Sequence, residues 1–96
     1  MQQYLITAYD YTDPDALQRR LAVRENHLAG ARRLKATGNF LTGGAILDVD
    51  GKMIGSMMVA QFATPEELAT WQRDEPYLNV RVWEKVDIKP FRMADV

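Results

Sequence analysis

The sequence predicts an α+β fold in which two helices cover one face of a four-stranded antiparallel sheet. Three patterns support this prediction: strand-like segments lie near both ends of the chain, a long helical repeat follows the first of them, and a hairpin lies in the middle. At 96 residues the chain is long enough for one domain, residues 1–96, with a single hydrophobic core.

The expected first strand covers residues 4–9, where β-branched and aromatic side chains are frequent. Asp13 is expected to cap the following helix, with Pro14 at its first position, where a missing N–H costs nothing. Gly38 is expected to end this helix. Its predicted buried face consists of residues that recur every three or four positions, namely Leu17, Leu21, Arg24, Leu28 and Ala31.

The second half of the chain carries clear start and stop signals. Thr64 is expected to cap a second helix, with Pro65 at its first position and Glu67 completing a capping box. The other elements expected here are a strand at residues 39–47, an Asp50-Gly51 turn, a strand at residues 53–62, a helix end before Pro76 and a strand at residues 80–91.

The resulting order, β-α-β-β-α-β, is that of the ferredoxin-like fold. Alternation along its strands places several apolar side chains on the sheet face away from the helices. Such a patch is larger than a monomer normally exposes, so we expect a homodimer packed sheet to sheet. The residues expected on this face are Leu5, Tyr9, Met57, Val59 and Trp83.

Composition excludes several functions. The formal net charge is −1, from 12 basic and 13 acidic residues, which gives no reason to expect nucleic acid. The chain has no cysteine and one histidine, so thiolate chemistry is excluded and no metal site is expected. No nucleotide-binding motif is present, and no cofactor is expected. Without a long apolar run or a signal peptide, no membrane association and a cytoplasmic location are expected.

His27 is the strongest candidate for chemistry, because imidazole exchanges a proton near neutral pH. It is expected at the edge of the helix face, within reach of a cleft. Pro76 disfavours helical geometry at Glu75, so Glu75 is presented from a turn, and either it or Asp74 could orient the imidazole. The alternatives are structural: a boundary histidine bonded to a backbone carbonyl, and a helix end with solvated carboxylates.

Two segments that contain glycine are weaker candidates. The Gly43-Gly44 pair within a strand marks a bulge or a close approach to the backbone. Neither this pair nor Gly55-Ser56 matches a phosphate-binding motif, and Ser56 lacks the sequence context of a catalytic nucleophile. For Ser56, a small polar residue on a strand is the simpler interpretation.

A series of short motifs resembles the YciI-like (YCII-related) family over essentially the whole chain. They occur in the order and spacing of that family, and the series is more specific than any single motif. The motifs are Arg24-Glu25-Asn26-His27-Leu28, Gly43-Gly44 after Leu41-Thr42, Gly55-Ser56, Glu75-Pro76-Tyr77 and Val86-Asp87-Ile88-Lys89-Pro90-Phe91.

The resemblance implies a ferredoxin-like fold that dimerises into an α/β barrel, with a histidine–aspartate acid–base pair in a pocket. The histidine corresponds to His27, Arg24 to a basic residue three positions earlier, and Ser56 to a serine on the third strand. The family typically has Asp-Pro-Tyr or Asp-Pro-Phe where this chain has Glu75, proline and Tyr77. Glutamate keeps the charge but adds a methylene, which changes the reach toward His27.

Two functions remain open. In the first, the protein is a cofactor-independent enzyme of the lyase, isomerase or hydrolase type, since the resemblance includes ring dehydrochlorination and lactone isomerases share the fold. His27 is then the acid–base, with Glu75 or Asp74 as its partner and Arg24 as a clamp for an anionic group on a small-molecule substrate. In the second, the dimer only binds a ligand or a partner protein. The remaining residues expected to contact a substrate are Ser56, Gly43, Gly44 and Tyr77.

Overall fold

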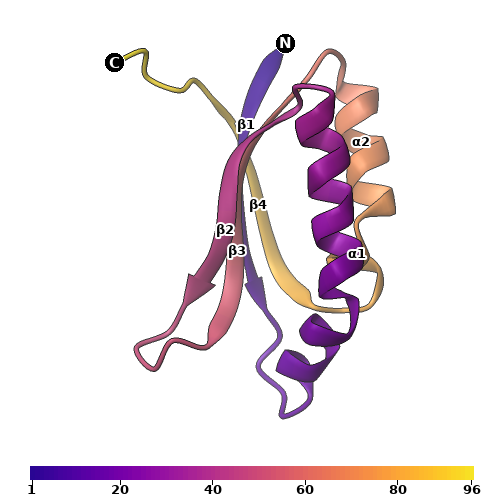
Figure 1. Ribbon diagram of the computed structural model, residues 1–96, viewed down its shortest axis with the longest axis vertical. Helices are drawn as coiled ribbons and strands as arrows, with labels where there is room; N and C mark the ends of the chain where they lie inside the picture. The colour runs from indigo at the N-terminus through magenta and orange to yellow at the C-terminus, as the bar shows by residue number, and fades with distance from the viewer.

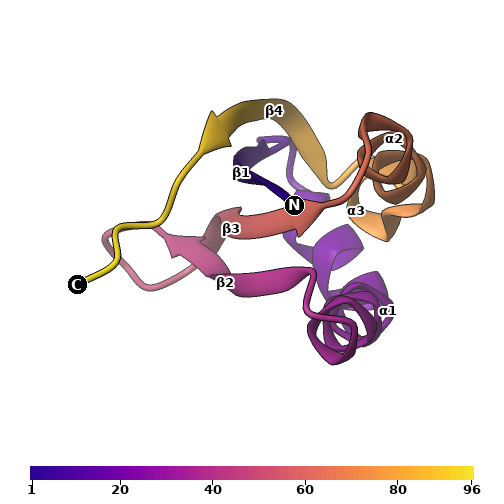
Figure 2. The ribbon, with the colours of Figure 1, turned by 90° about the horizontal axis from the view of Figure 1, so that it is seen from above.

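A computed structural model describes residues 1–96 and confirms the α+β fold. The sheet has the strand order β2-β3-β1-β4 with every neighbouring pair antiparallel. The long helices α1 and α2 lie on one face of the sheet (Figures 1 and 2). The elements are β1 (Gln2–Asp10), α1 (Ala16–Ala36), β2 (Phe40–Leu47), β3 (Met53–Phe62), α2 (Pro65–Asp74), α3 (Pro76–Asn79) and β4 (Trp83–Phe91).

The start of α1 differs from the prediction. The helix begins at Ala16, and Asp13 and Pro14 form a turn before it. Asp13 instead accepts a hydrogen bond from Asp15 N at 3.2 Å and forms an ion pair with Arg19 at 2.7 Å. The predicted helix end is confirmed, because Gly38 follows the last turn with φ of 78°, a conformation that glycine adopts without strain.

The face of α1 that points inward is only partly the predicted one: Leu28 lines a cavity beside the sheet, as a buried face would, but the first turns of the helix differ. Ala16 and Arg20 are its buried residues, whereas Leu21 is 54% exposed. The reason is electrostatic: β1 ends in a buried aspartate, Asp10, which pairs with Arg20 and turns this polar side of the helix toward the sheet. Hydrophobic spacing alone could not reveal that pairing.

The second helix is capped nearly as predicted, and a third helix follows it. Thr64 Oγ1 accepts from Glu67 N at 3.2 Å, and the Glu67 carboxylate accepts from Ala63 N, one residue before the cap. The short helix α3 was not predicted. It delays the last strand, which begins at Trp83 and not at residue 80.

The sheet has an inner face under the helices and an outer face. Ile6, Met58 and Phe62 belong to the main core on the inner face. The register pairs Leu5 with Val59, and the alternation of the strands places both on the outer face.

Trp83 corrects the prediction for the outer face. It packs in the inner core with Ala8 and Tyr77 and is 4% exposed. The register between β1 and β4 shifts after Tyr9, so that Asp10 lies opposite Trp83. This irregularity reverses the alternation at the start of β4 and turns the indole inward.

The two glycines of β2 differ in their surroundings. A Cβ on Gly43 would lie 2.7 Å from the Met57 carbonyl oxygen, whereas one on Gly44 would meet nothing within 4 Å. The expected close approach to the backbone is therefore present at Gly43 alone. The irregularity in pairing lies just before it, between Phe40 and Thr42.

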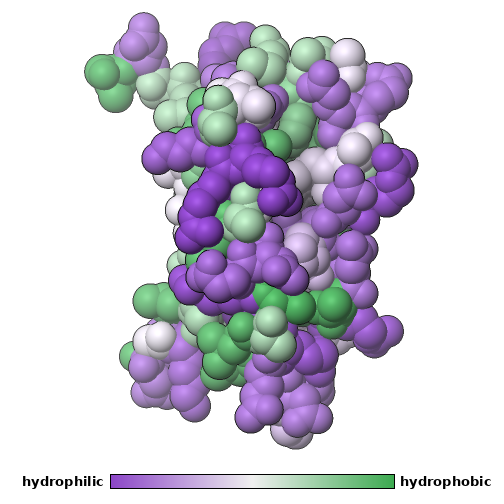
Figure 3. All heavy atoms as spheres, turned by 45° about the vertical axis from the view of Figure 1, so that its right-hand side comes forward, coloured by the Kyte–Doolittle hydropathy of each residue, from purple (hydrophilic) through white to green (hydrophobic).

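The surface over the helices is mostly hydrophilic, with hydrophobic side chains gathered in its lower part (Figure 3). None of the helices combines the length and the apolar character needed to cross a membrane.

Candidate active site

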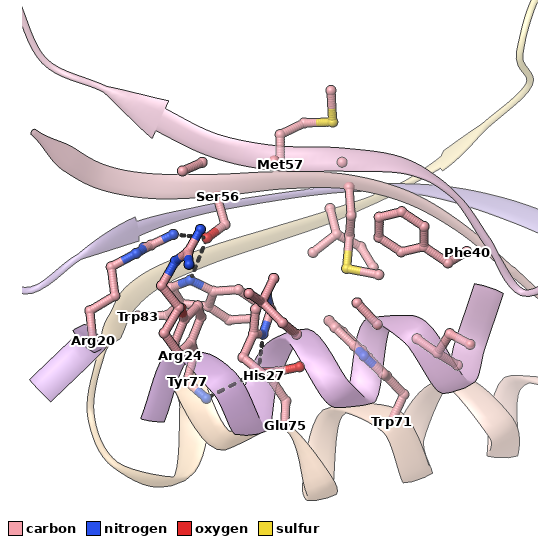
Figure 4. A pocket seen from close by; sticks show the side chains of 18 residues that line it. Arg20, Arg24, His27, Phe40, Ser56, Met57, Trp71, Glu75, Tyr77 and Trp83 are labelled. Atoms are coloured by element: carbon pink, nitrogen blue, oxygen red, sulfur yellow. Dashed lines mark hydrogen bonds and ion pairs between the residues drawn. The ribbon is translucent and has the colours of Figure 1, made fainter. Parts of the chain in front are cut away.

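A small cavity lies between α1 and the sheet, closed at one end by the junction of α2 and α3 (Figure 4). Its volume is about 120 Å³, and 11 of its 18 lining residues are hydrophobic. Its polar side chains come from three directions: Arg20, Arg24 and His27 from α1, Ser56 from β3, and Glu75 from the α2–α3 junction.

His27 and Glu75 form the shortest polar contact in the cavity, with Nδ1 of the imidazole 2.6 Å from Oε1 of the carboxylate. The side chains of His27 and Glu75 are 17% and 6% exposed. The local sequence presents Glu75, because the residue before Pro76 adopts an extended conformation and ends α2. With Nδ1 bonded to Glu75, Nε2 is the ring nitrogen left for a substrate.

Glu75 also holds the next helix. Its Oε1 atom accepts a hydrogen bond from Tyr77 N at 3.1 Å, so Glu75 is the N-cap of α3. The same oxygen therefore orients the imidazole and fixes the helix that carries Tyr77.

Aromatic rings fix the plane of the imidazole. Tyr77 stacks on His27 with 4.0 Å between ring centroids and 12° between planes, and Trp83 meets His27 edge-on at 5.7 Å. The Arg20 guanidinium lies 4.8 Å from the centroid of the Tyr77 ring. Burial raises the pKa of the Tyr77 hydroxyl, so this residue stays protonated in the site.

A buried charged network borders the cavity. Arg20 Nη1 donates to both carboxylate oxygens of Asp10, at 2.9 and 3.0 Å, and Nη2 donates to Ser56 Oγ at 2.9 Å. Trp83 Nε1 donates to the same Ser56 oxygen at 3.2 Å. Burial raises the pKa of Asp10, and the positive charge of Arg20 offsets part of that rise.

The sequence interpretation missed this network. Asp10 has the same strand parity as Ile6 and Ala8, which placed it on the inner face, and Arg20 precedes His27 by seven residues, two helical turns. These two spacings are the sequence features that could have indicated the buried network.

The structure brings most of the predicted site residues to one cavity but leaves one out. Asp74 is exposed and lies on a separate groove between α1 and α2. The acidic side chain beside His27 is that of Glu75. The other predicted residues that line the cavity are Arg24, Ser56, Gly43, Gly44 and Tyr77.

Comparison with known proteins identifies the same family as the sequence motifs. The model of the YCII-related domain matches residues 3–92. This chain belongs to the YCII-related domain family. Its relatives include the protein YciI of Escherichia coli O6:H1 and an uncharacterized protein of Haemophilus influenzae. Each is 36% identical over 95 residues, which cover 93% of this chain and 95% of the relative.

Solved structures similar to this YCII-related protein support its fold. One is 5-chloro-2-hydroxyhydroquinone dehydrochlorinase (TftG) of Burkholderia phenoliruptrix AC1100, in complex with 2,5-dihydroxybenzoquinone. The TM-score is 0.82 at 23% identity, over 96% of this chain and 95% of TftG. A NIPSNAP family protein of Agrobacterium tumefaciens has a TM-score of 0.55 at 17% identity, over 99% and 95% of the two chains.

Proposed function

We propose that this YCII-related protein is a cofactor-independent enzyme that moves a proton on a small ring compound. His27 is the general base and acid, and Glu75 is its orienting partner. The observation that carries this proposal is the 2.6 Å contact between His27 Nδ1 and Glu75 Oε1 at the wall of the cavity.

The contact suits proton transfer. Nδ1–H donates to the carboxylate, so Nε2 has a free lone pair that can take a proton from the substrate. The bonding electron pair stays on the substrate, where it forms an enolate or expels a leaving group. The carboxylate stabilises the imidazolium that results. A well-placed acid–base group of this kind contributes about 10² to 10⁴ in rate.

The cavity sets the size and class of the substrate. A cavity of about 150 Å³ holds one benzene molecule, so a volume of about 120 Å³ limits the substrate to no more than a single ring. Its mainly hydrophobic lining suits the faces of that ring, and Arg24, which extends from α1 toward Ser56 in Figure 4, can bind an anionic substituent. TftG, whose name specifies a chlorinated hydroxyhydroquinone, makes oxygenated rings the first compounds to test.

We also propose a homodimer that buries the outer face of the sheet. This face carries Leu5, Met57 and Val59 on the two central strands, β1 and β3. Val59 is already buried within one subunit, whereas Leu5 and Met57 are partly exposed. A second copy of the same face would cover Leu5 and Met57 and leave the cavity on the helix side of each subunit accessible.

Hydrogen exchange on bound compounds tests the proposed chemistry. A panel of oxygenated single-ring compounds and small lactones is screened for binding by NMR, and each binder is incubated with the protein in D₂O. We expect the wild-type protein to introduce deuterium into at least one binder. The variant His27→Gln should bind that compound and lose the exchange by about 10²-fold or more.

The control for this experiment is Asp74→Asn, because Asp74 lies outside the cavity. It should exchange at the wild-type rate. Equal exchange by wild-type protein and His27→Gln would contradict a catalytic role for His27. Binding with no exchange by the wild-type protein would favour a binding module.

A further inference from the structure

The Ser56 hydroxyl oxygen contacts two groups that can only donate. Arg20 Nη2 donates to Ser56 Oγ at 2.9 Å, and Trp83 Nε1 donates to it at 3.2 Å. A guanidinium and an indole N–H have no acceptor capacity, so the serine oxygen must be the acceptor in both bonds. Both lone pairs of the hydroxyl are used, and only its proton remains.

The proton of Ser56 has no acceptor within the protein. Ser56 is 7% exposed, and its side chain takes part in no hydrogen bonds other than the two that it accepts. It lines the cavity together with His27, and in Figure 4 it points from the sheet toward the helices. A buried donor without an acceptor costs free energy, which an oxygen atom of a ligand would recover.

Asp10 keeps this arrangement fixed. The side chains of Arg20 and Asp10 are 3% and 6% exposed, and either one would leave an unpaired buried charge if the other moved away. The Arg20 guanidinium is therefore a fixed positive group that both occupies the Ser56 oxygen and polarises its O–H bond. Its Nε–H atom has no partner in the protein.

We infer that Asp10, Arg20 and Trp83 are positioning residues that hold Ser56 as a one-way donor, and that the cavity selects rings with an anionic or carbonyl oxygen at this point. A ligand ammonium group, or an aryl amine whose lone pair is delocalised into its ring, cannot accept the Ser56 proton there, so it is rejected. The inference rests on the proposed function in taking the cavity as the substrate site. It concerns recognition, whereas His27 concerns proton transfer.

Two probes of the same ring size test this selectivity: 4-nitrophenolate, which presents an acceptor oxygen, and 4-nitroaniline, which presents an N–H donor. Trp71 and Trp83 line the cavity, so quenching of their fluorescence and the absorption band of the bound probe report binding. We expect the wild-type protein to bind 4-nitrophenolate about ten-fold tighter, as for a hydrogen bond to a charged acceptor.

Substitutions then separate recognition from folding. Ser56→Ala should remove the ten-fold preference by weakening the binding of 4-nitrophenolate alone. The matched control is Thr12→Ala, which deletes a hydroxyl on an exposed loop and should leave the preference intact. Trp83→Phe frees one lone pair of Ser56, so 4-nitroaniline should bind more tightly. If the role of Trp83 were merely structural, Trp83→Phe would weaken the binding of both probes equally.

The outcomes distinguish this inference from the proposed reaction. His27→Gln should keep the preference between the probes even though it loses proton transfer, and a protein that performs no proton transfer should still show it. The inference is overturned by equal affinities of the wild-type protein for the two probes, by no binding of either probe, or by a preference that survives in Ser56→Ala.

Discussion

At the scale of single residues, Glu75 has two roles that depend on one oxygen atom. Oε1 accepts from His27 Nδ1 at 2.6 Å and from Tyr77 N at 3.1 Å. An N-cap carboxylate must stay close to the backbone of its own helix. The additional methylene of glutamate lets the same carboxylate also reach an imidazole on another helix. The replacement of the family's aspartate is thus compatible with direct contact.

The buried pair of Arg20 and Asp10 should dominate stability at this scale. Arg20→Met removes one charge and leaves the other buried, which is expected to cost about 3–5 kcal/mol in the free energy of unfolding. Urea denaturation measures this change. Arg32→Met is the control, because its pair with Glu25 spans 3.6 Å between exposed side chains and contributes less than about 1 kcal/mol. Similar losses in the two variants would contradict the account of the network.

The sequence revealed the contact between His27 and Glu75 but not the charges behind it. A single histidine, a proline that fixes an acidic neighbour and a family resemblance all pointed to these two side chains. Arg20 and Asp10 gave no comparable signal, because isolated charged residues are usually exposed and only the fold shows that these two are paired in the interior.

At the scale of elements, α1 shows why hydrophobic spacing misled. Leu17 and Leu21 belong to the predicted face, yet the first turns of the helix place Ala16 and Arg20 inward, whereas Leu28 further along lines the cavity. A polar side of a helix can be buried when other elements supply hydrogen-bond partners for it. For Arg20 these partners are Asp10 on β1 and Ser56 on β3. The cap at Thr64 and the helix end at Gly38 were easier to predict, because these residues act on the backbone of their own segment, although the cap predicted at Asp13 was wrong.

Strand β2 offers a matched pair of glycine substitutions. Gly43→Ala places a methyl group 2.7 Å from the backbone oxygen of Met57, so the strands must separate, at an expected cost of about 1–3 kcal/mol. Gly44→Ala meets open space and should be neutral or slightly stabilising. Thermal unfolding of both variants measures the difference. Equal stability of the two would show that β2 does not pack as described.

The turn before α1 should give the protein an acid-dependent stability. Hydrogen bonds from Arg19 hold the pKa of Asp13 at about 2, below its ordinary value of 3.8. The folded state binds this proton less tightly, so the stabilisation is complete well above pH 3.8 and is lost as the pH falls toward 2.

Urea midpoints measured between about pH 5 and pH 2 test that dependence. Asp13→Asn should flatten this part of the stability curve, and so should Arg19→Gln, which removes the partner and keeps the carboxyl group. An unchanged slope in both variants would show that the ion pair does not form in solution.

At the scale of the whole molecule, the sheet and its two long helices were predictable because most of their boundaries have a local signal, although α1 and β4 begin later than predicted. Alternation along β1 and β3 also indicated the faces of Leu5 and Val59, whereas the strand order and the register come from the structure. Trp83 was placed on the wrong face because a single irregularity beside Asp10 reverses that alternation. Helix α3 was too short to give a helical period.

The proposed dimer predicts a response to charge on the outer sheet face. Met57→Asp places a carboxylate in an apolar interface and should give monomer or aggregate, measured by light scattering after size-exclusion chromatography. Val49→Asp is the control, because Val49 is fully exposed at the hairpin tip and should leave the assembly unchanged. A wild-type monomer, or a dimer that Met57→Asp leaves intact, would refute the proposed interface.

The most direct test of the central claim is the ¹⁵N NMR spectrum of His27, the only imidazole in the chain, at mildly alkaline pH. The account predicts that the neutral form of the ring carries its proton on Nδ1, donated to Glu75, and has a free lone pair on Nε2. Glu75→Gln should disturb both nitrogen shifts, and Asp74→Asn should disturb neither. A proton on Nε2 in the wild-type protein, or spectra that Glu75→Gln leaves unchanged, would contradict the claim that this pair is built for proton transfer.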